Sequence, residues 1–218
     1  MDKSKSWKCL SDFFDYLNSN ILYVVMRNFE GIPEYYNTEE HGDIDILTDN
    51  YMWFRKLSGV SKVYSERYRV HHEILIGDEK IRFDFRYVGD GYYDRKWEKD
   101  ILNNRTMGKG GIYIPNNEDY GYMLLYHALI QKKQIARDYT IKLNHLFGEG
   151  GWNMDYLKDF MNRRGYRFVC PNDHTVIYNW EDVALVPPIK RNLQKAYYMT
   201  KAFVRNKCRN LSIGGDFR

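Results

Sequence analysis

Apolar and polar residues alternate along several short segments in the first hundred residues, and this period of two predicts strands. The clearest segment runs from residue 42 to 47, where Asp43 and Asp45 alternate with isoleucines. Successive side chains of a strand point to opposite faces, so we expect both aspartates on one face. Two neighbouring carboxylates repel each other, and a divalent cation between them is the simplest way to relieve that repulsion.

A second alternating segment, residues 80–88, adds a third carboxylate. Phe83 and Phe85 face one way, whereas Asp84 faces the other way together with arginines. If the two strands are neighbours, three carboxylates meet on one sheet face, where their oxygens suit a hard cation such as Mg²⁺. Two such ions about 3.5–4 Å apart can activate an attacking oxygen and stabilise a leaving phosphate. The ordinary alternative is that these acids are solvated or paired with nearby arginines.

The remaining pattern predicts further strands, a tight turn and six helices. Gly77-Asp78-Glu79 has the residue types of a hairpin turn. The other predicted strands are residues 21–27, 60–64 and 69–76. The predicted helices are residues 7–19, 50–58, 94–103, 116–133, 138–147 and 153–164. This order predicts an α+β fold with a mixed or antiparallel sheet, helices on one face, and a small helical lobe after it.

The spacing of the carboxylates resembles the nucleotidyltransferase superfamily, whose fold is that of DNA polymerase beta. In that family an Asp-x-Asp strand is followed by a third aspartate on a later strand. Asp43 and Asp45 match the pair, and Asp84 matches the third position. The resemblance covers roughly residues 20–90 and implies an enzyme that depends on Mg²⁺ or Mn²⁺. Asp43 and Asp45 would bind the metals, and Asp84 would bind the catalytic metal and help deprotonate an acceptor hydroxyl.

The chain departs from this family where the first strand ends. The family has Gly-Ser there, but residues 21–26 are followed by Arg27-Asn28. Arg27 can offer a planar guanidinium to a phosphate, and Asn28 is a second candidate ligand of the nucleotide. The equally weighted alternative is an ion pair between Arg27 and an acid at 39–40 or Asp43.

Two later segments are weaker candidates for phosphate contacts. Lys109-Gly110-Gly111 is a basic, glycine-rich loop whose backbone amides could cradle a phosphate, although a simple turn is the more ordinary interpretation. The helix at 116–133 carries His127, for which a structural role is favoured over a catalytic one, and Lys132 near its end. The loop at residues 28–42 is long enough to serve as a lid, or is merely an irregular connection.

The wider layout resembles an uncharacterised bacterial branch of the superfamily that is associated with surface-polysaccharide biosynthesis. The segments that carry this likeness are residues 24–28, 42–45 and 124–132. It implies transfer of a nucleotidyl or phosphoryl group to a sugar, a polyol or a small phosphate. The donor would be a nucleotide such as CTP or ATP, or a nucleotide-activated group. The alternative is a non-catalytic nucleotidyltransferase-like binding module or antitoxin-type regulator, which the missing Gly-Ser favours.

Composition limits the remaining possibilities. With 218 residues, 44% of them hydrophobic, we expect a nucleotidyltransferase-like domain at 1–110, a mainly helical lobe at 111–187 and a tail at 188–218. The three cysteines lie far apart and indicate a reducing compartment. Cys170 and His174 lack a second pair of ligands for zinc. Neither a signal peptide nor an apolar run of about 20 residues is evident, so we expect a cytoplasmic protein.

The C-terminal segment differs in charge from the rest of the chain. Residues 189–218 contain eight Lys or Arg and only Asp216 as an acid, a net charge of +7, so the total of +4 leaves −3 for the remainder. An apolar stripe along 189–209 predicts a basic amphipathic helix, which would contact a membrane surface or an acidic partner, or pack on the body. The acidic remainder argues against nucleic acid as the main partner.

Overall fold

The computed structural model describes residues 7–36, 42–66, 68–169, 171–173, 176, 179, 197 and 200. Contacts divide the chain into one unit of residues 1–179 and another of residues 180–218. Of the predicted C-terminal helix, only Tyr197 and Thr200 are described, and both are helical. The rest of that prediction lies outside the described residues.

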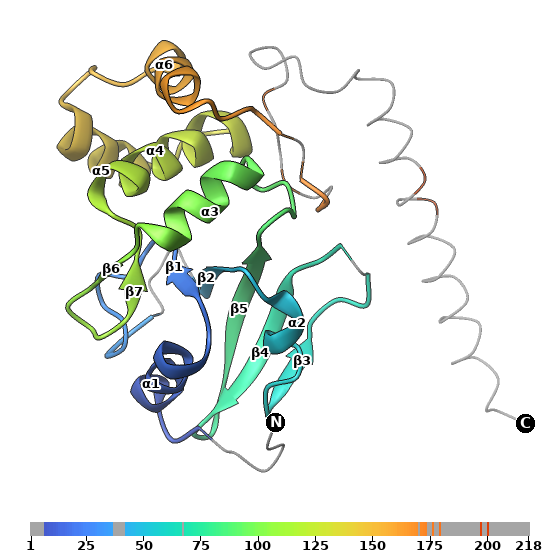
Figure 1. Ribbon diagram of the computed structural model, residues 1–218. Helices are drawn as coiled ribbons and strands as arrows, with labels where there is room; N and C mark the ends of the chain where they lie inside the picture. The colour runs from blue at the N-terminus through green and yellow to red at the C-terminus, as the bar shows by residue number, and fades with distance from the viewer. Residues whose placement is uncertain are drawn as a thin grey trace, which may run out of the picture. The chain divides into compact units, whose positions relative to one another are not determined.

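A mixed sheet of five strands forms the base of the first unit (Figure 1). Its spatial order is β1-β2-β5-β4-β3; β2 and β5 are parallel, and the other pairs are antiparallel. The α+β class and the mixed sheet are therefore confirmed. The strands are β1 (Tyr23–Val25), β2 (Asp43–Thr48), β3 (Val60–Lys62), β4 (His71–Ile76) and β5 (Glu79–Tyr87).

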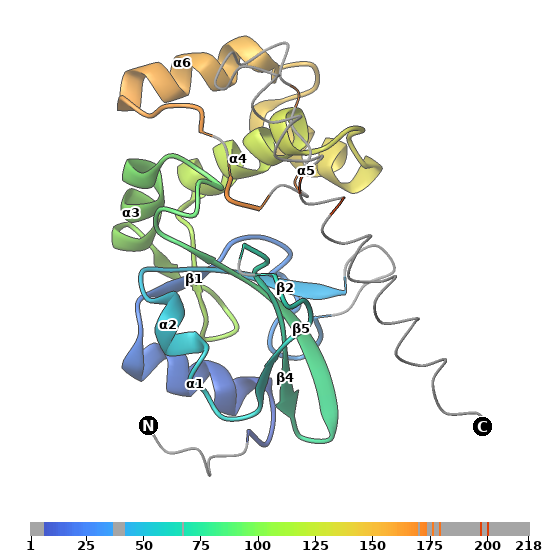
Figure 2. The same ribbon diagram turned by 90° about the vertical axis from the view of Figure 1, so that its right-hand side faces the viewer.

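One face of the sheet is apolar and is covered by α1 (Leu10–Asn20) and α2 (Tyr51–Phe54). Both helices lie on the same side of the strands in Figure 2. The alternation in β2 and β5 sends isoleucines and phenylalanines to this side, where they pack on aromatic residues of the helices. The main members of this core are Phe13, Phe14, Phe54, Ile44, Ile46, Phe83 and Phe85. The aspartates of β2 are thereby directed to the opposite face.

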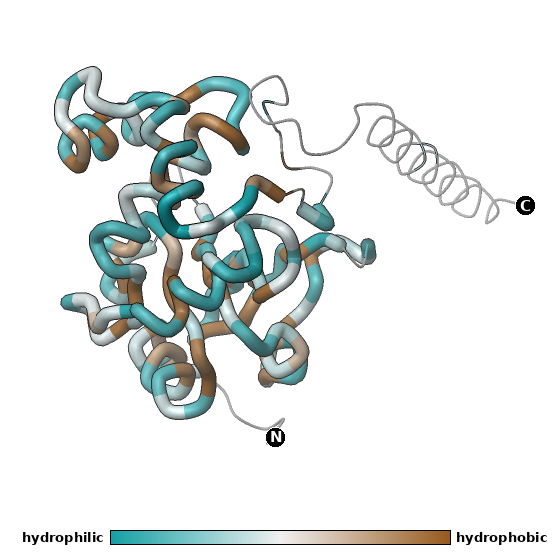
Figure 3. Tube along the Cα trace, turned by 45° about the horizontal axis from the view of Figure 1, so that its top comes forward, coloured by the Kyte–Doolittle hydropathy of each residue, from teal (hydrophilic) through white to brown (hydrophobic). Residues whose placement is uncertain are grey.

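A helical lobe lies beyond the ends of the strands in both ribbon views (Figures 1 and 2). It comprises α3 (Arg95–Asn103), α4 (Asn117–Tyr126), a π-helix (His127–Gln131), α5 (Arg137–Phe147) and α6 (Met154–Arg164). Brown, apolar stretches alternate with teal, polar ones along its helices in Figure 3. Aromatic residues in mostly edge-to-face contact fill its interior, among them Trp97, Tyr126, Phe160 and Tyr166.

The helix ends follow the capping residues of the sequence. Asp94, Asn116 and Asn153 precede α3, α4 and α6, and each side chain accepts a hydrogen bond from a backbone N–H of the first turn. The predicted helix through residue 133 is too long, because the α-helix ends at Tyr126. A π-helical turn follows it, and Lys132 has an extended backbone.

Two turns fix the connections that matter for the site. Gly77, at φ 58°, lies in the two-residue turn between β4 and β5, as the glycine there predicts. A short hairpin not foreseen from the sequence, β6 (Thr106–Met107) and β7 (Tyr113–Ile114), holds the glycine-rich loop. A Cβ atom at Gly110 would clash with the carbonyl oxygen of Ile32, so the hairpin packs tightly on the loop after β1. Among the described residues, no helix has the length and apolar character needed to cross a membrane.

Candidate functional site

The register of three strands places the predicted acids in one row. Asp45 lies opposite Asp84 across the parallel β2–β5 pair, and His71 lies opposite Asp84 across the antiparallel β4–β5 pair. Asp43 is two residues before Asp45 on the same strand and therefore on the same face. The structure thus brings together the three carboxylates that the sequence singled out, and it adds a histidine.

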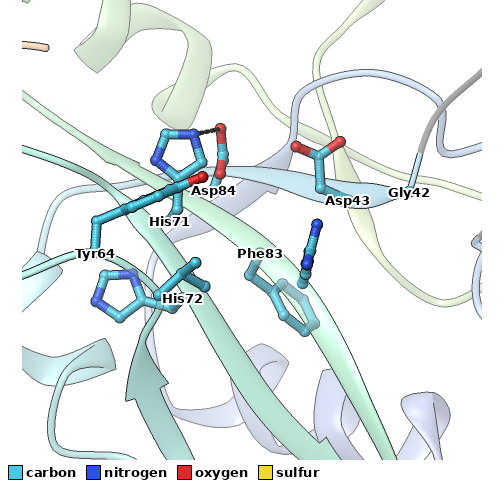
Figure 4. A pocket seen from close by; sticks show the side chains of 9 residues that line it. Gly42, Asp43, Tyr64, His71, His72, Phe83 and Asp84 are labelled. Atoms are coloured by element: carbon cyan, nitrogen blue, oxygen red, sulfur yellow. Dashed lines mark ion pairs between the residues drawn. The ribbon is translucent and has the colours of Figure 1, made fainter. Parts of the chain in front are cut away.

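Two clefts open on either side of this row, and both are lined by Asp43, His71 and Asp84. The first, which we call the hairpin cleft, has a volume of about 230 Å³ and is completed by residues of β4, β5 and the β3–β4 loop, including Tyr64 and Arg82. Figure 4 shows the carboxylates of Asp43 and Asp84 on the same side of the sheet at this cleft.

The second, the helical cleft, has a volume of about 250 Å³. Its walls come from the carboxylate row and from the helical lobe, and they carry three cationic side chains, Arg27, Arg86 and Lys132. Tyr92, His127 and Gln131 also line it. Asp43 and Asp84 therefore line both clefts, whereas Asp45 lines only the helical cleft, where three cationic side chains accompany the carboxylates.

Asp84 is the most perturbed of the three acids. It is 7% exposed, and burial raises its pKa from an ordinary 3.8 to about 7, with a further contribution from the negative charge of Asp45. Arg86 opposes this shift, whereas Asp43 adds to it. A carboxyl that titrates near neutral pH is suited to accept a proton.

His71 faces Asp84 as a neutral partner. Its Nε2 lies 3.5 Å from Oδ2 of Asp84, the contact dashed in Figure 4. Burial and, to a smaller extent, the positive charge of Arg69 lower the pKa of His71 to about 4. Between about pH 4 and pH 7 the proton therefore resides on the carboxyl and not on the imidazole, so this contact is not an ion pair in that range.

Arg27 already compensates one of the carboxylates. Its Nη2 donates to Oδ1 of Asp45 at 2.8 Å, and its Nη1 donates to the hydroxyl of Tyr92 at 3.1 Å. The guanidinium is 10% exposed, and the charge of Asp45 keeps its pKa well above the ordinary value despite burial. Arg27 therefore forms an ion pair, as the alternative interpretation predicted, but its partner is Asp45 rather than Asp43.

A hydrogen-bonded network continues from Tyr92 into the helical lobe. The Tyr92 hydroxyl lies 3.1 Å from Nδ1 of His127, which is also 2.8 Å from Oε1 of Gln131. Nε2 of Gln131 donates in turn to the backbone carbonyl of Tyr92 at 2.9 Å. This network fixes the orientation of the π-helix, and with it one wall of the helical cleft.

The other predicted ligands lie elsewhere. Asn28 has a φ of 55°, its Oδ1 accepts from Nζ of Lys142 at 3.0 Å, and it lines neither cleft. Lys109 lies in the turn of the β6–β7 hairpin and also lines neither cleft, so its role in phosphate binding stays a prediction without support from the geometry.

Comparisons with protein-family models, curated proteins and solved structures found no match for this chain. The site is therefore interpreted from its own chemistry.

The donor atoms of the row suit a hard cation, although they are not arranged as a finished site. Asp43 and Asp84 present carboxylate oxygens, and a cation would offset both causes of the raised pKa of Asp84, which are burial first and the charge of Asp45 second. Asp45 is held by Arg27. In the described part of the chain, no three His, Cys, Asp or Glu side chains are grouped so that they could hold a metal ion. The oxygen set fits Mg²⁺ or Mn²⁺ in type, and the two carboxylates not bound to Arg27 are the first ligands to test.

Several residues of the site were not foreseen. His71 could have been found by counting back from the Gly77–Asp78 turn, because a two-residue hairpin sets the pairing along both strands. Arg86 follows Asp84 on the same face of β5, so the alternation of polar and apolar residues could also have predicted its place in the site. Tyr92 and Gln131 had none, because they reach the cleft through tertiary packing alone.

Proposed function

We propose that this protein is a metal-dependent nucleotidyl- or phosphoryltransferase that acts on a sugar, a polyol or a small phosphate. The observation that carries the proposal is that Asp43 and Asp84 line two clefts, and that Asp45 and three cationic side chains line one of them. A transfer reaction needs a donor and an acceptor that meet at one catalytic group, and a phosphate-bearing donor needs positive charge around it.

We assign the donor to the helical cleft and the acceptor to the hairpin cleft. In the nucleotidyl case the acceptor oxygen forms a bond to the α-phosphorus while the bond between the α-phosphorus and its bridging oxygen to the β-phosphate breaks, and pyrophosphate leaves. In the phosphoryl case the attack is at the γ-phosphorus and the nucleoside diphosphate leaves. Asp84 accepts the acceptor's proton in either case, because its carboxylate lines both clefts and so lies where donor and acceptor meet.

A metal held by Asp43 and Asp84 would supply positive charge to the transferring phosphate. The chain itself contributes the remaining functions. His71 positions the carboxyl of Asp84 through the 3.5 Å contact. Arg27 and Arg86, which line the helical cleft beside the carboxylates, provide charge to the donor's phosphates. An acceptor of the sugar or polyol class also fits a place in surface-polysaccharide biosynthesis, which we include in the proposal.

One observation favours a second candidate, the non-catalytic binding module or regulator. The 2.8 Å ion pair between Arg27 and Asp45 already neutralises one carboxylate, as expected for a site that needs no metal. In that case the clefts would bind a ligand without turning it over.

The test begins with thermal unfolding in the presence of ATP, CTP, GTP or UTP, each with and without Mg²⁺. We expect metal-dependent stabilisation by one nucleotide, and its loss in Asp43→Asn and Asp45→Asn. Asp49→Asn is the matched control, because Asp49 is exposed and lines neither cleft. Stabilisation without metal, or equal stabilisation in all three variants, would favour the binding module.

The nucleotide that stabilises the protein is then incubated with glycerol, glucose and their monophosphates, and the products are separated by mass. Release of pyrophosphate identifies nucleotidyl transfer, and release of nucleoside diphosphate identifies phosphoryl transfer. No product with any acceptor, despite metal-dependent binding, would count against the enzyme.

A further inference from the structure

Two buried nitrogen atoms of residues that line the helical cleft lack a hydrogen-bond partner, and one of them is an acceptor while the other is a donor. In the described part of the chain, neither Nε2 of His127 nor Nε of Arg86 has a hydrogen bond. The two residues are 5% and 4% exposed, and both line the helical cleft. Leaving such groups unpaired is costly, which indicates that a ligand completes them. The inference drawn from this pair rests on the proposed function.

The character of the His127 atom follows from its neighbours. Nε2 of Gln131 donates to the carbonyl of Tyr92, so its Oε1 is the atom that faces Nδ1 of His127, at 2.8 Å. An amide oxygen accepts, hence Nδ1 carries the hydrogen; the tautomer is thus assigned from the network. Burial and the charge of Arg27 lower the pKa of His127 well below its ordinary value, which keeps the ring neutral. Nε2 is therefore an acceptor and needs a donor from the ligand.

Arg86 has the opposite requirement. Its guanidinium lies over the ring of Tyr92, 4.1 Å from the ring centroid, and Nη1 is 3.7 Å from Oδ2 of Asp90. These contacts hold the group in place but leave the N–H of Nε without an acceptor. An anionic oxygen of a ligand would satisfy this N–H, and Arg27 and Lys132 of the same cleft would balance its charge.

We propose that the helical cleft recognises a phosphate ester that carries a free hydroxyl, with a phosphate oxygen on Arg86 and the hydroxyl on His127. In a nucleotide donor, that hydroxyl belongs to the ribose. His127 is then a specificity-determining residue that selects ribonucleotides over their deoxy analogues. The selection arises because an analogue without the hydroxyl leaves Nε2 buried and unpaired.

The experiment measures binding of ATP, CTP, GTP and UTP and of their 2′-deoxy and 3′-deoxy forms by calorimetry in Mg²⁺. We expect the wild type to bind the best ribonucleotide about 10- to 100-fold more tightly than the form that lacks the recognised hydroxyl. His127→Phe should abolish the difference in affinity between the ribonucleotide and the deoxy form, and this ratio stays informative even where loss of the Gln131 contact weakens both. His127→Gln, which keeps an acceptor, should restore part of the difference.

Arg86→Met supplies an independent reading, because it should weaken ribo and deoxy forms by the same factor. Circular dichroism checks that each variant is folded. The inference is overturned if the wild type does not discriminate, or if folded His127→Phe discriminates as the wild type does; the proposed function stands in both cases. If no nucleotide binds to the wild type in Mg²⁺ or Mn²⁺, the proposed function fails and this inference fails with it.

Discussion

Replacing Asp84 by asparagine should stabilise the protein at neutral and alkaline pH while it removes the proposed proton acceptor. Asp84 is 7% exposed and has a pKa of about 7 in place of 3.8. Because the folded state holds this proton more tightly than the unfolded state, ionisation of Asp84 opposes folding. The neutral amide has nearly the same shape and avoids that cost.

The size of this stabilisation and the pH range in which it develops both depend on the pKa of Asp84 in the unfolded and in the folded state. The interval from 3.8 to about 7 corresponds to ~4 kcal/mol at 1.36 kcal/mol for each pH unit. Below about pH 4 both states are protonated, so the variant and the wild type should be equally stable. The wild type then loses stability as the pH rises from about 4 to 7. We expect Asp84→Asn to be about 2–4 kcal/mol more stable at pH 8, since some relaxation in the wild type reduces the full value.

Urea unfolding of both proteins in EDTA, from pH 4 to pH 8.5, measures this difference directly. Other acids with a shifted pKa, such as Glu98, whose pKa burial raises to about 8, are present in both proteins and largely cancel. Asp49→Asn, at an exposed position, should show no such trend. A difference that does not change with pH, or a variant less stable than the wild type at pH 8, would refute the reasoning.

Three further outcomes are expected. Arg27→Met leaves the 6% exposed side chain of Asp45 without its partner. Urea unfolding should show a loss of about 3–5 kcal/mol of folding stability in EDTA and a smaller loss in Mg²⁺. An equal loss in both would argue against a cation at this carboxylate. Gly110→Ala drives a Cβ into an opposing carbonyl and should lower folding stability by about 1–3 kcal/mol. Gly108→Ala should cost less, because its Cβ meets the flexible side chain of Ile114 at 3.2 Å and a carbonyl at 3.4 Å. Similar melting temperatures for the two variants would contradict this packing. Asn153→Ala removes the cap of α6 and should cost about 1 kcal/mol by the same assay, with no effect on nucleotide binding.

The carboxylate row could be predicted from the sequence because it depends on local alternation. Asp43 and Asp45 share a face in any strand, and only the pairing of β2 with β5 had to be added to bring Asp84 beside them. The strands, the caps and the turn at Gly77 have equally local causes. The finer identity of the fold as nucleotidyltransferase-like stays a proposal.

The walls of the helical cleft could not be predicted in this way. Tyr92 and His127 lie 35 residues apart in the sequence and meet only because the lobe folds back over the sheet. The π-helical turn that presents Gln131 interrupts the regular period on which a helix prediction depends. No pattern in the sequence reports that one nitrogen of a buried histidine lacks a partner, because this depends on every side chain around it.

The two-residue turn at Gly77 constrains how this protein can vary. The turn begins six residues after His71, a distance of about 20 Å along the strand, and its residues are exposed. Exposed turns commonly tolerate inserted residues. Here, an insertion absorbed by a register shift of one residue would move His71 away from Asp84 and turn its side chain to the opposite face. We therefore expect substitutions to be tolerated at Asp78 but not at Gly77, whose φ of 58° favours glycine, and changes of the turn's length to be excluded, although the turn touches neither cleft.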